Sequence, residues 1–425
     1  MAGDDYQTDD ARLPAAGALR WLFRGYETFV FVVALGPILD DLLSPYAASS
    51  LYFYAGIVLA ATLLGWAVGG TARALTINVV GQVNAITISL LGYAVVAGLT
   101  AASETFLAFA IFRFLAGAFL GIGGELTNAA ARTTDDRYTG SVSAGFGGGI
   151  VLASVAWAVL QTFDPQFLAP VFGPGPWRYL FAIGVLPAIA TPFVRRVAGS
   201  AQLTRNDDRT DTISIGDMFR GLTRRRTIVA AALAFAALAG WWGVVAWLPA
   251  YATTVTEGYG LARPDLWAAI AGACYGIGGI AGSLTAGTIA ERIGRVGSLL
   301  VMAIGSLSTV FGLFLLIRTP VLFSVMAVVV GYFTVGQFGW LSASLPELVP
   351  SDGTAIAVVW ATARLVAVPL PILIGYEIAV FDGIDTVVAA SAAVYAVGIL
   401  AVCYLPERET LMTDSRSRPA AETNG

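Results

Sequence analysis

Two ionisable side chains interrupt a run of the sequence, 106–126, that is otherwise almost wholly apolar. Arg113 lies inside this run and Glu125 closes it. A charge at bilayer depth costs about 2.5–3.5 kcal/mol even on a lenient insertion scale, so it is seldom carried without a reason. Arg113 is therefore a candidate binding residue, with a buried ion pair that only holds helices together as the alternative. Glu125, near a membrane face, is a weaker candidate.

Glu27 and Arg364 also lie within apolar segments. Arg364 is about 11 residues from the start of its segment, which is about 16 Å deep in a helix, and Arg113 reaches a similar depth from the opposite face. Burial raises the proton affinity of a carboxylate and a nearby arginine lowers it. That competition suits a proton-coupled step, so Glu27 is a candidate proton carrier. The alternative is a static pair with Arg24 or Arg113.

The composition predicts the class of protein that carries these charges. Of 425 residues, 57% are hydrophobic and 12% are charged, with a mean hydropathy of +0.76. The apolar residues come in blocks of about 20, the length of a membrane-spanning helix. The chain is therefore predicted to be an all-α, multi-pass membrane protein.

Two absences exclude several chemistries. The 24 basic residues are all arginine, and there is no histidine. A phosphate-binding loop of the GxxxxGK[ST] type needs its lysine, and a Ser-His-Asp triad or a histidine-ligated zinc needs its histidine. Cys274 and Cys403 are expected to be small apolar residues. We therefore expect no enzyme, no cofactor and no metal, and the pI near 5.0 argues against nucleic acid as a partner.

The apolar blocks form two sets of six, separated by a polar stretch. The predicted spans are 21–43, 51–76, 83–101, 105–128, 139–163 and 177–194, then 227–253, 266–290, 297–317, 320–343, 353–378 and 385–404. The predicted domains are a tail (1–18), an N-terminal six-helix bundle (19–194), a linker (195–226), a C-terminal six-helix bundle (227–406) and a second tail (407–425). Such duplication suggests two bundles around a site at the bilayer midplane.

Arginine placement predicts the orientation. With twelve spans, both ends and the linker share one side, which holds most of the arginines, including the eight between 195 and 226. The other side holds only Arg178, Arg263 and Arg318. The positive-inside rule then places both termini and the linker in the cytoplasm of a cell-membrane protein. Within the linker, apolar residues at 213–219 allow either an amphipathic surface helix or a solvated connection.

The sequence GTIAERIGRV at 287–296 resembles the loop signature of the major facilitator superfamily, G-x-x-x-[DE]-R-x-G-R, between helices 8 and 9. Other pieces resemble the metabolite:proton symporter branch, which includes sugar, aromatic-acid, lactate and sialate carriers. They are RGYE (24–27), RFLAG and GIGGE (113–125), PWRYLFAIGVLP (176–187), WLP (247–249) and LPELVP (345–350). The resemblance implies 12 transmembrane helices in two pseudo-symmetric six-helix bundles.

The same resemblance implies a gate built from charges at the helix ends. Glu291, Arg292 and Arg295 form the cluster after helix 8, and Glu125 and Arg73 are further gate candidates. The equivalent loop after helix 2 has lost its charges, since its acid and two arginines are replaced by the residues Asn78, Val79 and Gln82. An asymmetric gate is therefore expected.

By resemblance, helices 1, 4, 7 and 10 line a central cavity. Arg113 and Arg364 with Glu27 would leave one net positive charge there, which suits a monoanion because guanidinium binds carboxylate bidentately. Further candidates to contact the substrate are aromatic and amide side chains, with helix packing as the alternative role of the aromatic ones: Tyr26, Trp241, Trp242, Gln337 and Trp340.

These features predict secondary transport of a small organic metabolite by alternating access. A monocarboxylate taken up with protons is the favoured substrate, and the chain is expected to act as a monomer in the bilayer. Two alternatives stay open: a carrier of neutral sugars or polyols, and a transporter-like sensor or scaffold that binds a ligand but moves nothing.

Overall fold

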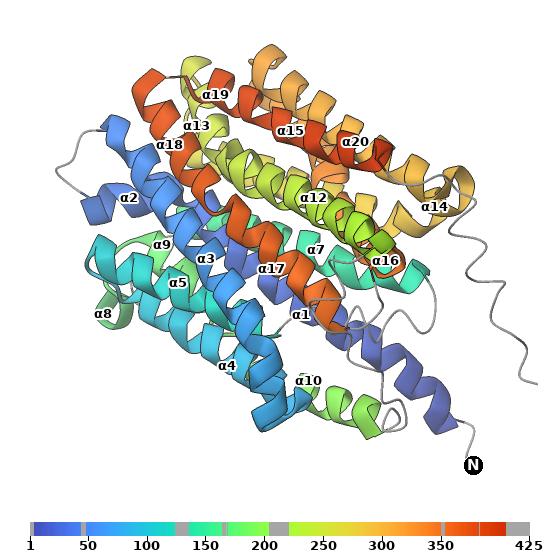
Figure 1. The fold of residues 1–425 in the computed structure, drawn as a ribbon. Coiled ribbons are helices and arrows are strands. Elements are labelled where there is room, and N and C mark those ends of the chain that lie inside the picture. Colours follow the sequence, from blue (N-terminus) through green and yellow to red (C-terminus); the bar gives the residue numbers. More distant parts are fainter. Residues whose placement is uncertain are drawn as a thin grey trace, which may run out of the picture.

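The computed structural model describes residues 4–43, 48–123, 136–163, 167, 169–203, 221–349, 353–381 and 383–404. The described chain is a bundle of long helices that run roughly along one direction, joined by short turns (Figure 1). It contains no strand among these residues. The all-α architecture follows from the composition, because a bilayer leaves backbone polar groups no partner outside their own helix.

The first half of the chain forms helices that match the first six predicted spans. They are α1 (Asp4–Val33), α2 (Leu35–Leu43), α3 (Ala48–Val80), α4 (Gln82–Ala101), α5 (Phe106–Gly123), α7 (Asp136–Phe163), α8 (Ala169–Phe172), α9 (Pro176–Ile183) and α10 (Pro187–Leu203).

The second half repeats this pattern. Its elements are α12 (Gly221–Gly243), η2 (Val245–Trp247), α13 (Leu248–Gly258), α14 (Pro264–Leu316), α15 (Pro320–Thr334), α16 (Gly336–Leu348), α17 (Gly353–Ala367), α18 (Pro369–Phe381), α19 (Ile384–Ser391), η3 (Ala392–Val394) and α20 (Tyr395–Cys403).

Within the described residues, 11 helices are long and apolar enough to cross a bilayer, and the bent pair α1–α2 brings the number to 12. The bend between α1 and α2 is 59°. The chain is thus a multi-pass membrane protein, and the predicted spans agree with the helices to within a few residues. One difference is at the start, where α1 begins at Asp4, inside the predicted tail. The apolar residues at 213–219 and part of the predicted span 105–128 lie outside the described residues.

Three helix pairs make the main contacts between the halves. α7 packs along α14, and α3 packs along α18 and α17. Gly147 of α7 and Gly276 of α14 face one another so closely that a side chain on either would collide with the backbone of the other. Glycine is needed at such a contact because any Cβ atom would push the two helices apart.

The turn after α3 and the turn inside α14 share one backbone conformation. Gly81 has φ 80° and ψ 163°, and Gly294 has φ 75° and ψ 163°. Both lie in a region that glycine adopts far more readily than other residues. The two halves therefore keep the same turn, although only the second keeps charged residues around it.

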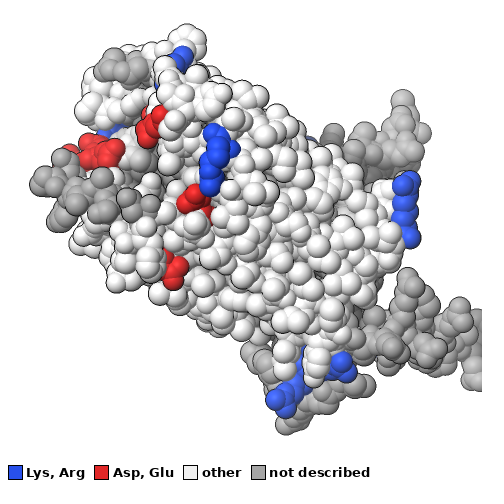
Figure 2. Space-filling model, turned by 90° about the horizontal axis from the view of Figure 1, so that it is seen from above, with Lys and Arg blue, Asp and Glu red and all other residues white. Residues whose placement is uncertain are grey.

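The exterior is apolar over most of its area. Large apolar side chains are exposed along the spans, for example Val95 (61%) on α4 and Leu107 (69%) on α5. Figure 2 shows charged side chains gathered in the left part of one face and at its right and lower edges, with a broad band without charged side chains between them. Such a surface is stable against lipid and would be unusual for a monomeric protein in water.

Candidate substrate cavity and buried ion pair

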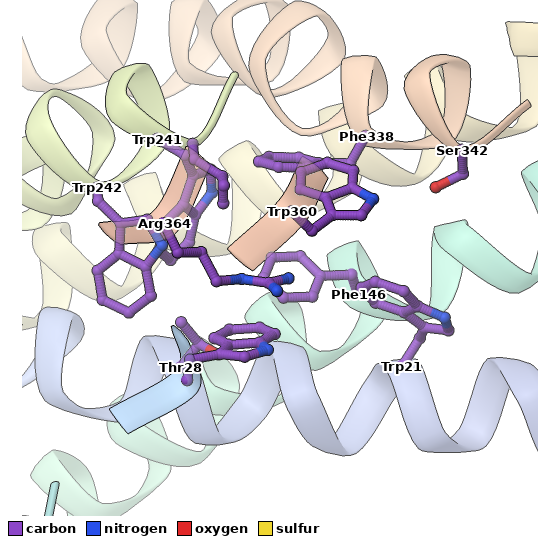
Figure 3. A pocket seen from close by; sticks show the side chains of 11 residues that line it. Trp21, Thr28, Phe146, Trp241, Trp242, Phe338, Ser342, Trp360 and Arg364 are labelled. Carbon is purple, nitrogen blue, oxygen red and sulfur yellow. The ribbon is translucent and has the colours of Figure 1, made fainter. Parts of the chain in front are cut away.

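A cavity lies between the two halves, lined by side chains from α1, α3 and α7 of the first half and α12, α16 and α17 of the second (Figure 3). Its walls are mostly aromatic. The lining residues are Trp21, Thr28, Trp66, Phe146, Leu238, Trp241, Trp242, Phe338, Ser342, Trp360 and Arg364.

The aromatic rings form a connected wall across the two halves. Trp66 meets Trp242 with ring centroids 6.5 Å apart, and Phe146 meets Trp241 at 5.8 Å. Both contacts are edge-on, an arrangement that aromatic quadrupoles favour. These contacts join α3 and α7 to α12, so the wall exists only when both halves are folded together.

Arg364 is the only charged residue among the described residues that line the cavity. It is buried, and its guanidinium carbon lies 4.9 Å from the ring centre of Trp66 and 5.6 Å from that of Trp360. Figure 3 shows its side chain reaching into the space between the aromatic rings. Indole faces attract and orient a guanidinium group, whose in-plane N–H groups can bind a carboxylate in two-pronged fashion.

The cavity is nearly filled by its own side chains in this conformation. Its free volume is about 40 Å³, enough for water but far below the several hundred Å³ of a typical small-molecule pocket. An organic substrate therefore fits only after the lining side chains or helices have moved.

A buried ion pair lies behind the cavity wall. Arg113 Nη2 of α5 donates to Glu27 Oε1 of α1 over 2.6 Å, and each side chain is 1% exposed. The same Nη2 donates to Thr100 Oγ1 of α4 over 3.2 Å, and the guanidinium lies 4.7 Å from the ring centre of Phe181 of α9. Four helices of the first half thus meet at this pair.

Two polar atoms of this ion pair lack a hydrogen-bond partner in the described part of the chain. Glu27 Oε2 and Arg113 Nε are buried and have no hydrogen-bond partner among the described residues. A carboxylate oxygen without a donor is the atom to which a proton can add without displacing an existing bond. Glu27 is followed on α1 by Thr28, which lines the cavity. The ion pair and the cavity therefore meet within one helical turn.

The structure separates the predicted substrate-contacting residues into two groups. Arg364, Trp241 and Trp242 line the cavity, whereas the others are not among the described lining residues. Of these, Arg113 pairs with Glu27. The remaining three donate to backbone carbonyl oxygens: Tyr26 to Leu180 over 2.6 Å, Gln337 to Thr334 over 2.9 Å and Trp340 to Gly282 over 3.2 Å.

Several lining residues were missed by the sequence analysis, notably Trp21, Trp66, Phe146 and Trp360. None of them is charged, and Trp66, Phe146 and Trp360 lie on the second, fifth and eleventh spans, outside the four spans expected to line the cavity. One pattern could have found some of them. Trp66 and Phe146 stand among glycines that bring their helices close to neighbours.

The gate candidates lie at helix ends. Glu291 and Arg292 are exposed beside the Gly294 turn, and Arg73 is half-buried near the end of α3. Glu125 lies outside the described residues, as does the side chain of Arg295. Around the Gly81 turn, Asn78 and Val79 are exposed, Val79 to 82%.

We predict that the charged residues beside the Gly294 turn affect the rate of transport, whereas the uncharged residues beside the Gly81 turn do not. Arg292→Ala should lower the initial uptake rate several-fold if, as the gate hypothesis expects, this charge holds the ends of neighbouring spans in one conformation. Gln82→Ala, next to Gly81 in the equivalent turn, is the matched control and should change the rate little. The measurement is uptake per mole of protein in proteoliposomes. Equal losses in the two variants would contradict an asymmetric gate.

Comparison with known proteins agrees with this architecture. The profile of the Major Facilitator Superfamily matches residues 22–371. The cis,cis-muconate transport protein of Acinetobacter baylyi is 24% identical over 84% of this chain and 86% of its own length. The gentisate transporter of Corynebacterium glutamicum is 26% identical over 88% of this chain and 83% of its own length.

A solved structure gives the same fold. The proton:xylose symporter XylE bound to 6-bromo-6-deoxy-D-glucose superposes with a TM-score of 0.67 at 15% identity, over 94% of this chain and 95% of that one. The predicted fold and the resemblance noted at 287–296 are confirmed. The long family match, the 11 to 12 candidate spans and the shared fold place this chain in the Major Facilitator Superfamily, as a multi-pass membrane transporter and not an enzyme.

Proposed function

We propose that this transporter carries a small aromatic monocarboxylate across the cell membrane, together with a proton, by alternating access. The observation that carries the proposal is the cavity between the halves, where aromatic walls surround a single buried arginine. Flat apolar walls favour a planar ring, and a guanidinium group favours a carboxylate. The relative named as a gentisate transporter supports this substrate class, because gentisate is an aromatic monocarboxylate. The relative named for cis,cis-muconate supports only an organic anion, because muconate is an open-chain dicarboxylate.

The proposal assigns the two membrane arginines different tasks. Arg364 binds the substrate carboxylate. Trp241 and Trp242 contact the substrate beside that carboxylate, and Phe146 and Trp360 pack against the ring. Arg113 acts on Glu27, which it holds by a 2.6 Å ion pair. Breaking a buried pair typically costs about 3–5 kcal/mol, because it leaves an uncompensated charge. Protonation of Glu27 at Oε2 weakens this pair, and that is the step through which a proton would alter how the helices pack.

The small volume of the cavity supports alternating access. The site is nearly filled by its own side chains, and the halves meet along α7–α14 and α3–α18. We propose that the halves rock about these contacts and open the cavity to one side at a time. The charges of Glu291, Arg292 and Arg295, with Arg73 and Glu125, would then hold helix ends together in one of the two conformations.

We further propose that both termini lie in the cytoplasm and that one chain is the working unit. The arginine asymmetry supports the orientation, because only Arg178, Arg263 and Arg318 are expected on the outer side. A reporter fused after Gly425 should be found in the cytoplasm, and an external reporter would overturn the orientation.

Transport into proteoliposomes tests the proposed function. Uptake of radiolabelled benzoate, hydroxybenzoates, lactate, xylose and a polyol is compared with and without an inward proton gradient. We expect the aromatic acids to accumulate, and only when the gradient is present. Uptake of the sugar without uptake of any acid would establish the alternative substrate class. Binding of a ligand without transport of any solute would favour a sensor.

A further inference from the structure

The lining residue Trp21 has a buried hydrogen-bond donor. A substrate carboxylate bound to Arg364 would not use this donor. The indole nitrogen Nε1 of Trp21 is buried and has no hydrogen-bond partner among the described residues. Leaving such a donor unsatisfied costs about 1–3 kcal/mol. Apolar side chains could pack at this position without that cost, so the donor calls for an explanation.

The connectivity of the helices places this donor at one end of the cavity. α1 and α17 begin at the membrane face at which α16 ends, because consecutive spans alternate in direction. Trp21 precedes Thr28 by two turns, about 10 Å along α1. Arg364 follows Trp360 by one turn, and so lies farther from that face. Ser342 follows Phe338 by one turn, and so lies nearer to it.

Figure 3 agrees with this placement. Trp21 and Ser342 lie toward one side of the cavity and Trp242 toward the other, with the Arg364 guanidinium between them. Trp21 and Ser342 both line the cavity. One end of the site therefore carries an N–H and a hydroxyl group, while the middle carries the positive charge.

We propose that Trp21 Nε1 and Ser342 Oγ recognise a second polar group of the substrate, an oxygen on the aromatic ring at the end opposite the carboxylate. This inference rests on the proposed function, because it takes Arg364 to hold the carboxylate. It makes Trp21 and Ser342 specificity-determining residues for a hydroxylated aromatic acid.

The physical reason is a difference between apolar and polar recognition. Aromatic walls accept any planar ring of suitable size and discriminate weakly between rings with and without a hydroxyl group. A site whose buried donor bonds to that hydroxyl rejects the analogue lacking it, since the donor is then left unpaired. The indole N–H and the serine hydroxyl supply discrimination that the apolar faces of the aromatic rings cannot.

Binding of two acids that differ by one hydroxyl group tests this proposal. Isothermal titration of the purified full-length protein in lipid nanodiscs gives the affinities for 4-hydroxybenzoate and benzoate. The wild type should bind 4-hydroxybenzoate about tenfold more tightly, which corresponds to one satisfied hydrogen bond. Trp21→Phe should lower the affinity for 4-hydroxybenzoate about tenfold, to the benzoate level, and should change the affinity for benzoate much less. Ser342→Ala should act in the same direction.

The matched control is Trp157→Phe. Trp157 of α7 is also a fully buried tryptophan whose indole nitrogen has no hydrogen-bond partner among the described residues, and it does not line the cavity. Its replacement should leave the ratio of the two affinities as in the wild type. A Trp157→Phe variant that loses the preference as Trp21→Phe does would overturn the proposal.

The remaining outcomes distinguish failure of the specificity proposal from failure of the proposed function. If the wild type binds both acids equally, or if both Trp21→Phe and Ser342→Ala keep the preference, the specificity proposal fails while the substrate class stands. If Trp21→Phe weakens both acids to the same degree, Trp21 only packs against the ring, and the proposal fails. If the wild type binds neither acid but binds xylose, the proposed function and this inference fail together.

Discussion

Replacing Glu27 by glutamine should abolish proton-driven accumulation of substrate while leaving exchange of labelled for unlabelled substrate largely intact. Glutamine keeps an oxygen in place of Oε1, which accepts the 2.6 Å hydrogen bond from Arg113, but it cannot take up or release a proton. The neutral amide resembles the protonated acid, so the carrier can still change conformation with substrate bound. Accumulation and counterflow are measured in the same proteoliposomes.

Glu257→Gln is the control for this substitution, because Glu257 is exposed near the end of α13. It should leave both activities unchanged. Undiminished accumulation in Glu27→Gln would show that coupling lies elsewhere, for example at Asp40 or Asp41. Loss of both activities would instead favour a structural role, in which Glu27 neutralises Arg113 and holds α1 against α5.

Replacing Arg364 by lysine should weaken binding of an aromatic carboxylate by roughly ten- to a hundredfold. A lysine keeps the charge but loses the planar, two-pronged donor and the stacking against Trp66 and Trp360. One charge-assisted hydrogen bond contributes about 1.5–3 kcal/mol, which sets the size of the effect. The measurement is equilibrium binding of benzoate to the purified variant.

Arg196→Lys provides the matched control, since Arg196 is exposed on α10. Its affinity for benzoate should equal that of the wild type. If Arg364→Lys binds a neutral sugar at wild-type strength and no carboxylate competes for the site, the cavity is a sugar site and the anionic substrate is excluded. Unchanged benzoate affinity in Arg364→Lys would show that another group holds the carboxylate.

The membrane spans could be predicted from the sequence because each is a local property. A block such as 83–101 is apolar and long enough to cross a bilayer wherever its neighbours lie, and it appears as α4 (Gln82–Ala101). The start of the first helix is an exception, because the residues before the apolar block are polar. Polar residues near the N-terminus predicted a tail, whereas the helix already begins at Asp4.

For the buried carboxylate of Glu27, the sequence indicated two possible partners but could not choose between them. The sequence allowed Glu27 to pair with either Arg24, one turn earlier on the same span, or Arg113, on the fourth span. The structure pairs Glu27 with Arg113 and directs Arg24 Nη2 to the carbonyl oxygen of Leu120, at 2.8 Å. Arg24 lies one turn before Glu27 on α1 itself, and Arg113 lies on α5. Both can reach the carboxylate, and only the packing of α1 against its neighbours decides between them.

The turns show how the sequence and the structure complement each other. The charges of 287–296 identified the family, and their loss at 78–82 indicated a degenerate copy. The conformation shared by Gly81 and Gly294 shows that the turn itself is retained. A glycine with positive φ preserves the backbone geometry whether or not charges surround it.

The sequence by itself determined that the chain is a multi-pass membrane protein, where its spans lie and which few ionisable residues lie inside them. These properties follow from hydropathy and charge, which are local to each segment. What only the tertiary structure decided is the cavity. Its wall joins residues such as Trp66, Trp242 and Trp360 from three spans and both halves. Apolar residues point to lipid, to a neighbouring helix or into a cavity with nearly the same local pattern, and only the packing of all the helices selects among them.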